Sequence, residues 1–365
     1  MRTNGPRLHH QVSPYLDATI TLMRFLAVAL LVLASCMNQP RTDDRQSATS
    51  QGALLRDATA RRDTIGVDTN AIVQLARELS SDKMRGRGPW TPENELVARR
   101  LAAELTRLGA QPLFGDALLV PFTTAERPRD TVFNVVGVVR GRAGTTAGDL
   151  VGITAHLDHL GVGKPDATGD SIYNGFLDAA LPIAMVLDVA RRYRNAPGDR
   201  PLAVMFFNLE EQGLLGSKAL LARGDAASVV SRLGLLVGVD AGSPAGEATE
   251  WQLMGALPGH AGARLADSIA RARGWTTTPT APRAISDVFP FSQQGVPILF
   301  PIPGRTWRGY TEVQRAAAMR RFDHYHQPSD EWRSDFPLTG TASFADWLWM
   351  IVRVASDRRT VPGRT

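Results

Sequence analysis

Two adjacent glutamates, Glu210 and Glu211, follow a short and almost wholly apolar run at residues 201–207. Such a run is typical of a strand buried on both faces, and a helix is expected from about Gly213 onward. Open α/β sheets bind their ligands at the carboxyl ends of strands, which is where this pair would lie. Adjacent carboxylates there repel each other unless a cation or a proton offsets their charge. Capping of the following helix is the simpler explanation of one such pair, so the rest of the chain must decide.

Other ionisable side chains occupy comparable positions. Predicted buried strands end at His156 and at Asp240. Asp178 directly precedes a predicted helix, and His326 lies in a predicted loop. In a right-handed doubly wound sheet the ends of successive strands converge on one crevice. With Glu211, two imidazoles and three carboxylates form a ligand set suited to zinc, and two ions fit if one carboxylate bridges them. Taken singly, His156 could be a core histidine, Asp178 a helix cap and Asp240 a turn residue.

The elements that must position these residues alternate along the chain. Apolar runs predict strands at residues 118–122, 133–140, 150–155, 201–207, 233–239 and 296–300. Amphipathic stripes predict helices at residues 68–79, 91–108 and 262–273, after Asp178, after Gly213 and near the C-terminal end. This alternation indicates an α/β fold, in which helices flank a mostly parallel, doubly wound mixed sheet.

The composition excludes some classes of partner. With 365 residues, 44% of them hydrophobic, the chain can bury a large core. The formal net charge is +5, and nearly all of the positive charge is arginine, since lysine occurs only at positions 83, 164 and 218. No block of basic residues suggests a nucleic-acid-binding face, so we expect no nucleic-acid partner.

The single cysteine, Cys36, stands shortly after an apolar run at residues 25–34, which Arg24 precedes. Ten apolar residues are too few to span a bilayer, but they suit the core of a signal peptide. The sequence Leu-Ala-Ser-Cys resembles the bacterial lipobox, in which the cysteine is lipidated. An ordinary signal sequence with an incidental cysteine is the alternative. We therefore expect an exported lipoprotein, anchored to the membrane through Cys36 and facing the periplasm or the cell exterior.

Composition also sets the expected segment boundaries. The predicted segments are a signal peptide at residues 1–36, a polar tether at 37–66, a folded domain at 67–357 and a tail at 358–365. Either Met1 or Met23 could be the start of the signal peptide. Without Cys36 the remaining chain has no cysteine, so it has neither disulfides nor thiolate metal ligands.

Five short motifs in the domain resemble those of a known family. They are AHLDHLG (155–161), GDSIYNGFLD (169–178), NLEEQGLLGS (208–217), GVDAG (238–242) and YHQPSDE (325–331). In this order they are similar to the motifs of the di-zinc aminopeptidases, metallopeptidase family 28, whose relatives include leucyl aminopeptidases, glutamate carboxypeptidases and glutaminyl cyclases. The resemblance extends over residues 72–354 and includes the stretches SSDKMRGRG and SDVFPFSQQGVP.

The resemblance implies a role for each matching residue. Four residues would be terminal ligands of two zinc ions: His156, Glu211, Asp240 and His326. Asp178 would bridge the ions, Glu210 would be the general base, and Asp158 would orient the His156 imidazole. Weaker candidates for structural or supporting roles are His159, His324 and Asp330. Four further residues could line a cleft or simply pack: Tyr325, Arg305, Trp307 and Tyr310.

The domain is thus expected to be a zinc peptidase domain that removes N-terminal residues from peptides with a water that bridges two metal ions. Two positions depart from the family pattern: residues 179–182 read Ala-Ala-Leu-Pro rather than Asn-Ala-Ser-Gly, and Val288 stands where histidine is common. Neither removes a ligand, but both alter the expected lining of the site. The alternatives are an acyl transfer like that of glutaminyl cyclases, or a non-catalytic binding module on the same fold. The preferred N-terminal residue and the oligomeric state stay open.

Overall fold

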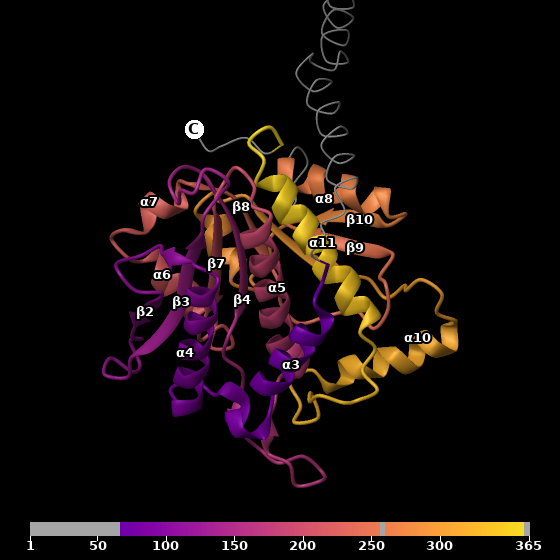
Figure 1. Ribbon diagram of the computed structural model, residues 1–365. Coiled ribbons are helices and arrows are strands. Elements are labelled where there is room, and N and C mark those ends of the chain that lie inside the picture. The colour runs from indigo at the N-terminus through magenta and orange to yellow at the C-terminus, as the bar shows by residue number, and fades with distance from the viewer. Residues whose placement is uncertain (1–65, 256–259, 361–365) are drawn as a thin grey trace, which may run out of the picture. The chain divides into compact units, whose positions relative to one another are not determined.

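The computed structural model describes residues 66–255 and 260–360 (Figure 1). The predicted signal peptide with Cys36, nearly all of the tether at 37–66 and the end of the tail lie outside the described residues. In the part of the chain that is described, no helix combines the length and the apolarity needed to cross a membrane.

One mixed sheet forms the centre of the described domain. Its strand order is β1-β3-β7-β4-β8-β11-β9-β10, and β2 also pairs with β3. The bounds are β1 Gln111–Pro112, β2 Leu119–Phe122, β3 Val132–Val139, β4 Leu150–His156, β7 Leu202–Phe207, β8 Leu233–Gly238, β9 Glu250–Met254, β10 Thr276–Thr280 and β11 Ile298–Pro303. The four central strands β7, β4, β8 and β11 are parallel, whereas β3 and β9 run antiparallel to their central neighbours β7 and β11. This mixed sheet, parallel at its centre, confirms the predicted α/β fold class.

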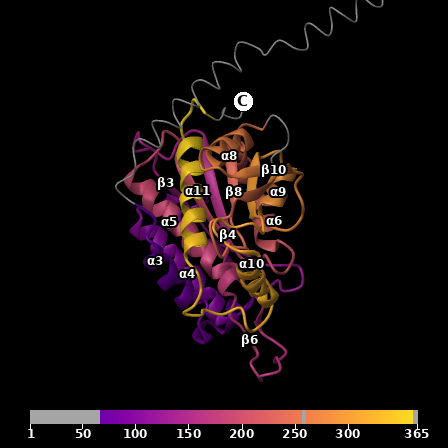
Figure 2. The same ribbon diagram turned by 90° about the vertical axis from the view of Figure 1, so that its right-hand side faces the viewer.

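Helices cover both faces of the sheet. One face carries α3 (Thr69–Leu79), α4 (Pro92–Arg107), α5 (Leu181–Asn195), α8 (Ala261–Ala272) and α11 (Thr339–Ala355). The other carries α6 (Leu215–Leu221), α7 (Ala226–Val230) and α9 (Val288–Gln293). Figures 1 and 2 show α3, α4, α5 and α11 together on one side of the strands. Both faces are therefore buried, which is why the central strands read as continuous apolar runs.

Side chains alternate along β7, so this one strand contributes to the hydrophobic cores on both faces of the sheet. Leu202, Val204 and Phe206 belong to the core under α5. Ala203, Met205 and Phe207 belong to the core under α6 and α9. All six residues of the strand are buried. Successive side chains of a strand point to opposite faces, so burial on both faces fixes the register of the strand.

This register brings the ionisable residues to one edge. β4 ends at His156 and is hydrogen-bonded to β7 on one side and to β8 on the other. β7 ends directly before Asn208, and β8 ends two residues before Asp240. The parallel strands thus deliver three site segments side by side, as the sequence predicted.

The remaining elements complete this end of the domain. They are the turns η1 (Asp82–Arg87), η2 (Phe176–Ala180) and η3 (Arg320–His324), the hairpin β5 (Gly161–Val162) and β6 (Ile172–Tyr173), and α10 (Glu312–Met319). Here η2 is a π-helical turn that carries Asp178 just before α5 begins at Leu181. The helix α10 leads through η3 into the loop that carries His326.

Candidate active site

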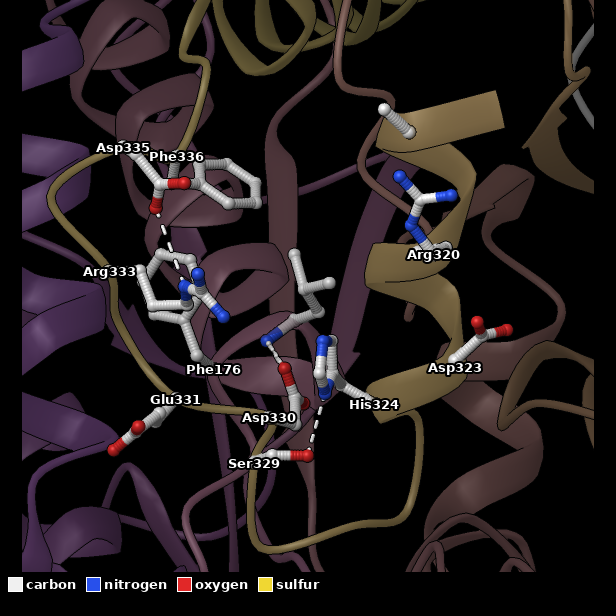
Figure 3. Close-up of a pocket in the computed structure, with 12 residues that line it drawn as sticks. Phe176, Arg320, Asp323, His324, Ser329, Asp330, Glu331, Arg333, Asp335 and Phe336 are labelled. Atoms are coloured by element: carbon white, nitrogen blue, oxygen red, sulfur yellow. Dashed lines mark hydrogen bonds and ion pairs between the residues drawn. The ribbon is translucent and has the colours of Figure 1, made fainter. Parts of the chain in front are cut away.

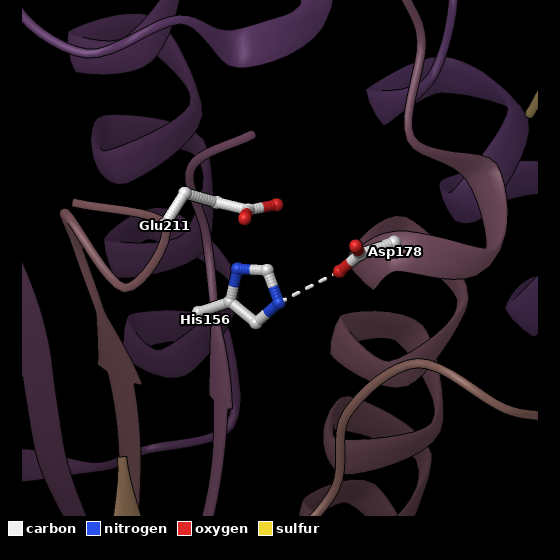
Figure 4. A group of neighbouring side chains, drawn as sticks. All are labelled: His156, Asp178 and Glu211. Atoms are coloured by element: carbon white, nitrogen blue, oxygen red, sulfur yellow. Dashed lines mark hydrogen bonds and ion pairs between the residues drawn. The ribbon is translucent and has the colours of Figure 1, made fainter. Parts of the chain in front are cut away.

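Asp178 lies at the centre of the predicted ligands. Its Oδ1 atom is 3.0 Å from Nε2 of His156, and its Oδ2 atom is 3.0 Å from Nε2 of His326. Each imidazole has a second carboxylate neighbour: Oδ1 of Asp240 is 3.1 Å from His156, and Oε2 of Glu211 is 3.2 Å from His326. Figure 4 shows His156, Asp178 and Glu211 directed toward one another from three separate segments. The structure thus brings all five predicted ligands together.

The arrangement has two similar halves that share one carboxylate. One half contains His156 and Asp240 with one oxygen of Asp178, and the other contains His326 and Glu211 with the second oxygen. A shared carboxylate flanked by two imidazole–carboxylate pairs is the donor set that two neighbouring divalent cations require.

The donor atoms also fit a metal ion by their hydrogen bonding. Donor atoms of His156, Asp178 and Glu211 lie within 4.8 Å of one another, as ligands of one ion would. Within the described residues, Oδ2 of Asp178 and Nε2 of His326 are buried without a hydrogen-bond partner, although they lie close together. Buried polar atoms that make no hydrogen bond are uncommon, and a metal ion bound between these two atoms would satisfy both. Nitrogen and oxygen donors without sulfur suit zinc.

The charges of the cluster shift the pKa values of its members. Burial disfavours the charged form of His156, but Asp240, Asp158 and Asp178 outweigh this and raise its pKa well above the usual value. Contacts with Asp178 and Glu211 raise the pKa of His326 to about 10. Burial alone would raise the pKa of Asp178 and Glu211, but the neighbouring histidines lower both, that of Glu211 to about 2. Without a metal the cluster is therefore held together by imidazolium–carboxylate attraction.

Glu210 differs from its neighbour Glu211. Burial, opposed in part by His156, raises the pKa of Glu210 to about 10, and repulsion from Asp240 and Asp287 adds to the shift. In the metal-free cluster this carboxyl group therefore prefers its neutral form, and cations bound beside it would favour the carboxylate form that a general base requires. The structure thus places the two glutamates in different surroundings, with Glu211 in contact with His159 and His326 and Glu210 beside the cluster.

Asp158 acts through different contacts from those expected. Its carboxylate oxygens accept hydrogen bonds from the backbone N–H groups of Glu210 (3.1 Å) and Glu211 (3.3 Å). Nδ1 of His156 lies 3.2 Å from the backbone carbonyl of Asp158 and 3.8 Å from its carboxylate. The aspartate therefore orients His156 mainly through its main chain, and it holds the Glu210–Glu211 turn through its side chain.

Of the three weaker candidates, His159 and Asp330 contact predicted ligands, whereas His324 has no described contact with them. His159 is fully buried, and its Nδ1 atom lies 2.8 Å from Oε1 of Glu211. The Asp330 carboxylate accepts hydrogen bonds from the N–H groups of Leu177 and Asp178, which fixes the backbone at the shared carboxylate. His324 instead lies 2.6 Å from the Ser329 hydroxyl, away from the five ligands.

A cavity of about 390 Å³ adjoins Asp330 on the side of η3 (Figure 3). Phe176 and Phe336 contribute apolar surface to it, while Arg320 and Arg333 line it together with acidic side chains. Asp330 thus separates this cavity from the peptide N–H groups that it holds in η2. Acidic side chains outnumber the two arginines in the lining.

The predicted cleft residues do not form one group. The Tyr325 ring stacks on the His326 ring with centroids 3.9 Å apart, and Tyr325 is 52% exposed, so it is accessible beside the ligands. Trp307 is buried and packs edge-on against Tyr310, whose hydroxyl donates to the Ala245 carbonyl. Trp307 therefore packs in the core, whereas Arg305 has no described contact with the ligand cluster.

Two buried residues near the cluster were not singled out from the sequence. Asp287 is buried, and burial raises the pKa of its carboxyl group to about 8. It lies in the SDVFPFSQQG stretch, where the Ser-Asp pair was the only available indication. Arg87 is fully buried in the SSDKMRGRG stretch, and nothing in its sequence neighbourhood predicts that an arginine there is inside the protein.

The sheet thus carries, at its carboxyl edge, a cluster of histidines and carboxylates that could hold metal ions. The chain belongs to Peptidase family M28, whose model matches residues 134–352. This membership makes it a metallopeptidase and confirms the family resemblance of its motifs. A comparison with curated protein sequences found no match.

Solved structures show the same fold at low sequence identity. The Legionella pneumophila LapA aminopeptidase has a TM-score of 0.58 and 14% identity, over 82% of this chain and 71% of that one. BSAP, a zinc aminopeptidase from Bacillus subtilis, has a TM-score of 0.59 and 14% identity, over 82% of this chain and 98% of that one. A glutaminyl cyclase from an Acidobacteriales bacterium has a TM-score of 0.56 and 14% identity, over 80% and 95%. The fold is therefore common to peptidases and cyclases.

Proposed function

We propose that this protein is a zinc aminopeptidase that binds two zinc ions and hydrolyses N-terminal residues from peptides. The observation that carries this proposal is the position of Asp178, whose two carboxylate oxygens face two separate histidines, each with its own carboxylate. Family membership supports peptide-bond hydrolysis. Similarity in fold to two aminopeptidases supports removal of residues from the N-terminal end.

Two zinc ions held by these five residues would polarise the scissile carbonyl and lower the pKa of the attacking water. With cations bound, Glu210 would be ionised and would accept one proton of the water at a carboxylate oxygen as the water oxygen bonds to the scissile carbonyl carbon. It would then donate that proton to the nitrogen of the leaving amine as the C–N bond breaks. Asp158 holds the backbone of Glu210, so the general base keeps its place beside the cluster. His159 fixes one oxygen of Glu211 and leaves the other directed at His326.

A panel of aminoacyl reporter substrates tests this proposal on the purified full-length protein. We expect hydrolysis that zinc supports and a chelator abolishes, with no cleavage of N-acetylated substrates. A peptide with N-terminal glutamine separates the competing activities, because cyclisation releases ammonia and hydrolysis releases free glutamine. Ammonia release without free amino acid would replace the peptidase proposal by cyclisation. Zinc binding without either product would favour the binding module.

We also propose that the protein is an exported lipoprotein with peptides as its partners in the periplasm or outside the cell. The support is the apolar run at residues 25–34 and the Leu-Ala-Ser-Cys sequence that ends at Cys36. Firm anchoring requires at least two lipid signals, which a diacylated cysteine would supply. Cys36→Ala should release the protein from the membrane fraction, whereas a wild-type protein without lipid on Cys36 would contradict the anchor.

A further inference from the structure

Arg87 is a fully buried cation that contacts backbone carbonyls. It is 0% exposed, and within the described residues its hydrogen-bond partners are backbone carbonyls rather than carboxylates. Its guanidinium N–H groups donate to the carbonyls of Leu157 (3.1 Å), Leu79 (2.8 Å), Asn174 (2.8 Å), Gly175 (3.0 Å) and Asp178 (3.1 Å). The planar fork of arginine supplies five N–H donors in a fixed geometry, and here all of them are directed at the main chain.

The acceptors belong mainly to the segments that carry metal ligands. Leu157 is the residue between His156 and Asp158, at the end of β4. Asn174 and Gly175 lead into η2, which contains Asp178, and the carbonyl oxygen of the bridging residue itself accepts a hydrogen bond from Arg87. One rigid side chain thus connects the backbone beside His156 to the backbone of Asp178.

The surrounding backbone is packed closely against this guanidinium. Gly175 has a φ of +61°, and a Cβ atom there would lie 2.7 Å from Nη2 of Arg87 and 2.3 Å from the carbonyl oxygen of Asp178. Only glycine is therefore tolerated at this position. On the opposite side, the Asp330 carboxylate accepts the N–H groups of Leu177 and Asp178. The segment of the bridging aspartate is consequently held from both sides.

The buried charge also matters for the cluster. Burial lowers the pKa of Arg87 to about 10, while Asp178, Asp330, Asp158 and Glu211 oppose this shift, so the group stays protonated at neutral pH. A permanent cation close to several carboxylates reduces their mutual repulsion. Since arginine has no free acceptor, it cannot act as a metal ligand itself.

From this geometry we propose that Arg87 is a positioning residue, which sets the spacing between His156 and Asp178 and so preorganises the metal centre. The inference rests on the proposed function for the identity of the metal. Groups that orient metal ligands are typically worth a factor of about 10–100 in metal affinity. Lysine at this position would keep the charge but concentrate three donors on one nitrogen, so it could not connect both segments.

The test compares Arg87→Lys and Arg87→Gln with Arg200→Lys in the full-length protein. Arg200 is a suitable control because it is 1% exposed and donates to the carbonyls of Ala355 and Asp357, far from the ligands in the fold. Zinc dissociation constants are measured by competition with a chromogenic chelator, and thermal unfolding is measured with and without zinc. Michaelis constants and turnover are measured on an aminoacyl reporter.

We expect Arg87→Lys to fold and to bind zinc about 10–100-fold more weakly than the wild type, with a lower turnover number and a smaller gain in thermal stability from zinc. Arg87→Gln should be weaker still, because it loses the charge as well. Arg200→Lys should bind zinc like the wild type, whatever its stability. Unchanged zinc affinity in folded Arg87→Lys and Arg87→Gln would overturn the proposal. Failure of both to fold would also overturn it, because Arg87 would then support the fold as a whole.

The two proposals fail in different ways. A wild-type protein that binds zinc without hydrolysing or cyclising any peptide would refute the peptidase proposal, yet the zinc affinities would still decide the role of Arg87. A wild-type protein that hydrolyses peptides, with equal zinc affinity in all variants, would refute only the role of Arg87.

Discussion

Replacing Asp178 by asparagine should remove one of the two metal ions while leaving the shape of the site almost unchanged. In the structure each carboxylate oxygen faces a different histidine nitrogen at 3.0 Å. An asparagine side chain offers one oxygen, and its NH₂ group cannot be a ligand. One half of the site then keeps only two protein ligands, fewer than the three that catalytic zinc sites usually have. We expect zinc content to fall from about two ions per chain to one or fewer.

The same substitution should also lower the free energy of unfolding of the metal-free protein. Asp178→Asn weakens the charge-assisted hydrogen bond to His156, worth about 1.5–3 kcal/mol, and removes the ion pair with His326. His156 keeps Asp240 and His326 keeps Glu211, so part of this energy is retained. The free energy of unfolding should therefore fall by about 1–3 kcal/mol, as measured by denaturant titration of chelator-treated protein.

Asp188→Asn is the matched control for this experiment. Asp188 is also buried, and it lies in the middle of α5, the helix that follows Asp178, but it pairs with Arg191 at 2.6 Å and has no described contact with the ligands. It should lose stability and keep both zinc ions in elemental analysis after dialysis. Two zinc ions in the Asp178→Asn protein would refute the bridging role.

Two further predictions concern protons and backbone support. His156 and His326 have raised pKa values, so in the metal-free protein their contribution to stability is complete below the unfolded value of about 6.5 and is lost as the pH rises, for His326 through about 10. Between about pH 6.5 and pH 10, the midpoint of thermal unfolding of chelator-treated protein should fall, whereas zinc affinity should rise. A midpoint that rises with pH would contradict the raised pKa values of the two histidines. Asp330→Ala leaves the N–H groups of Leu177 and Asp178 unpaired. It should lower the free energy of unfolding by about 1–3 kcal/mol and weaken zinc binding, and unchanged zinc affinity would show that Asp330 serves only the fold.

The sequence predicted the centre of the fold because its strands are buried on both faces. β4, β7 and β8 are continuous apolar runs, and their ends carry the ligands. β9 and β10 were not predicted, since they lie toward the edge of the sheet and alternate with exposed residues, and β10 contains Pro279. β9 pairs with β11 and β10 pairs with β9, and no local pattern reveals such contacts between distant segments.

The motifs predicted the ligand set, but they did not predict the contacts that hold the ligands in place. Residue types and positions at strand ends marked His156 and the Glu210–Glu211 pair as candidates, and only the motif match separated the two glutamates. The carbonyl contacts of Arg87 could not be predicted, because they join α3, the end of β4 and the approach to η2. The main-chain contact of Asp158 with His156 also depends on backbone geometry after the strand ends. Supporting contacts of this kind arise only when distant segments have packed.

The most direct test of the account compares Glu210→Gln with Glu211→Ala by zinc content and steady-state kinetics. Glutamine at position 210 keeps the size of the side chain but cannot accept a proton. The account predicts that Glu210→Gln retains both zinc ions, that its turnover number falls by about 10²–10⁴, and that KM changes far less. Glu211→Ala should lose zinc as well as activity, since Glu211 faces His326 in the cluster. Near-normal turnover by a zinc-loaded Glu210→Gln protein would contradict the proposed mechanism.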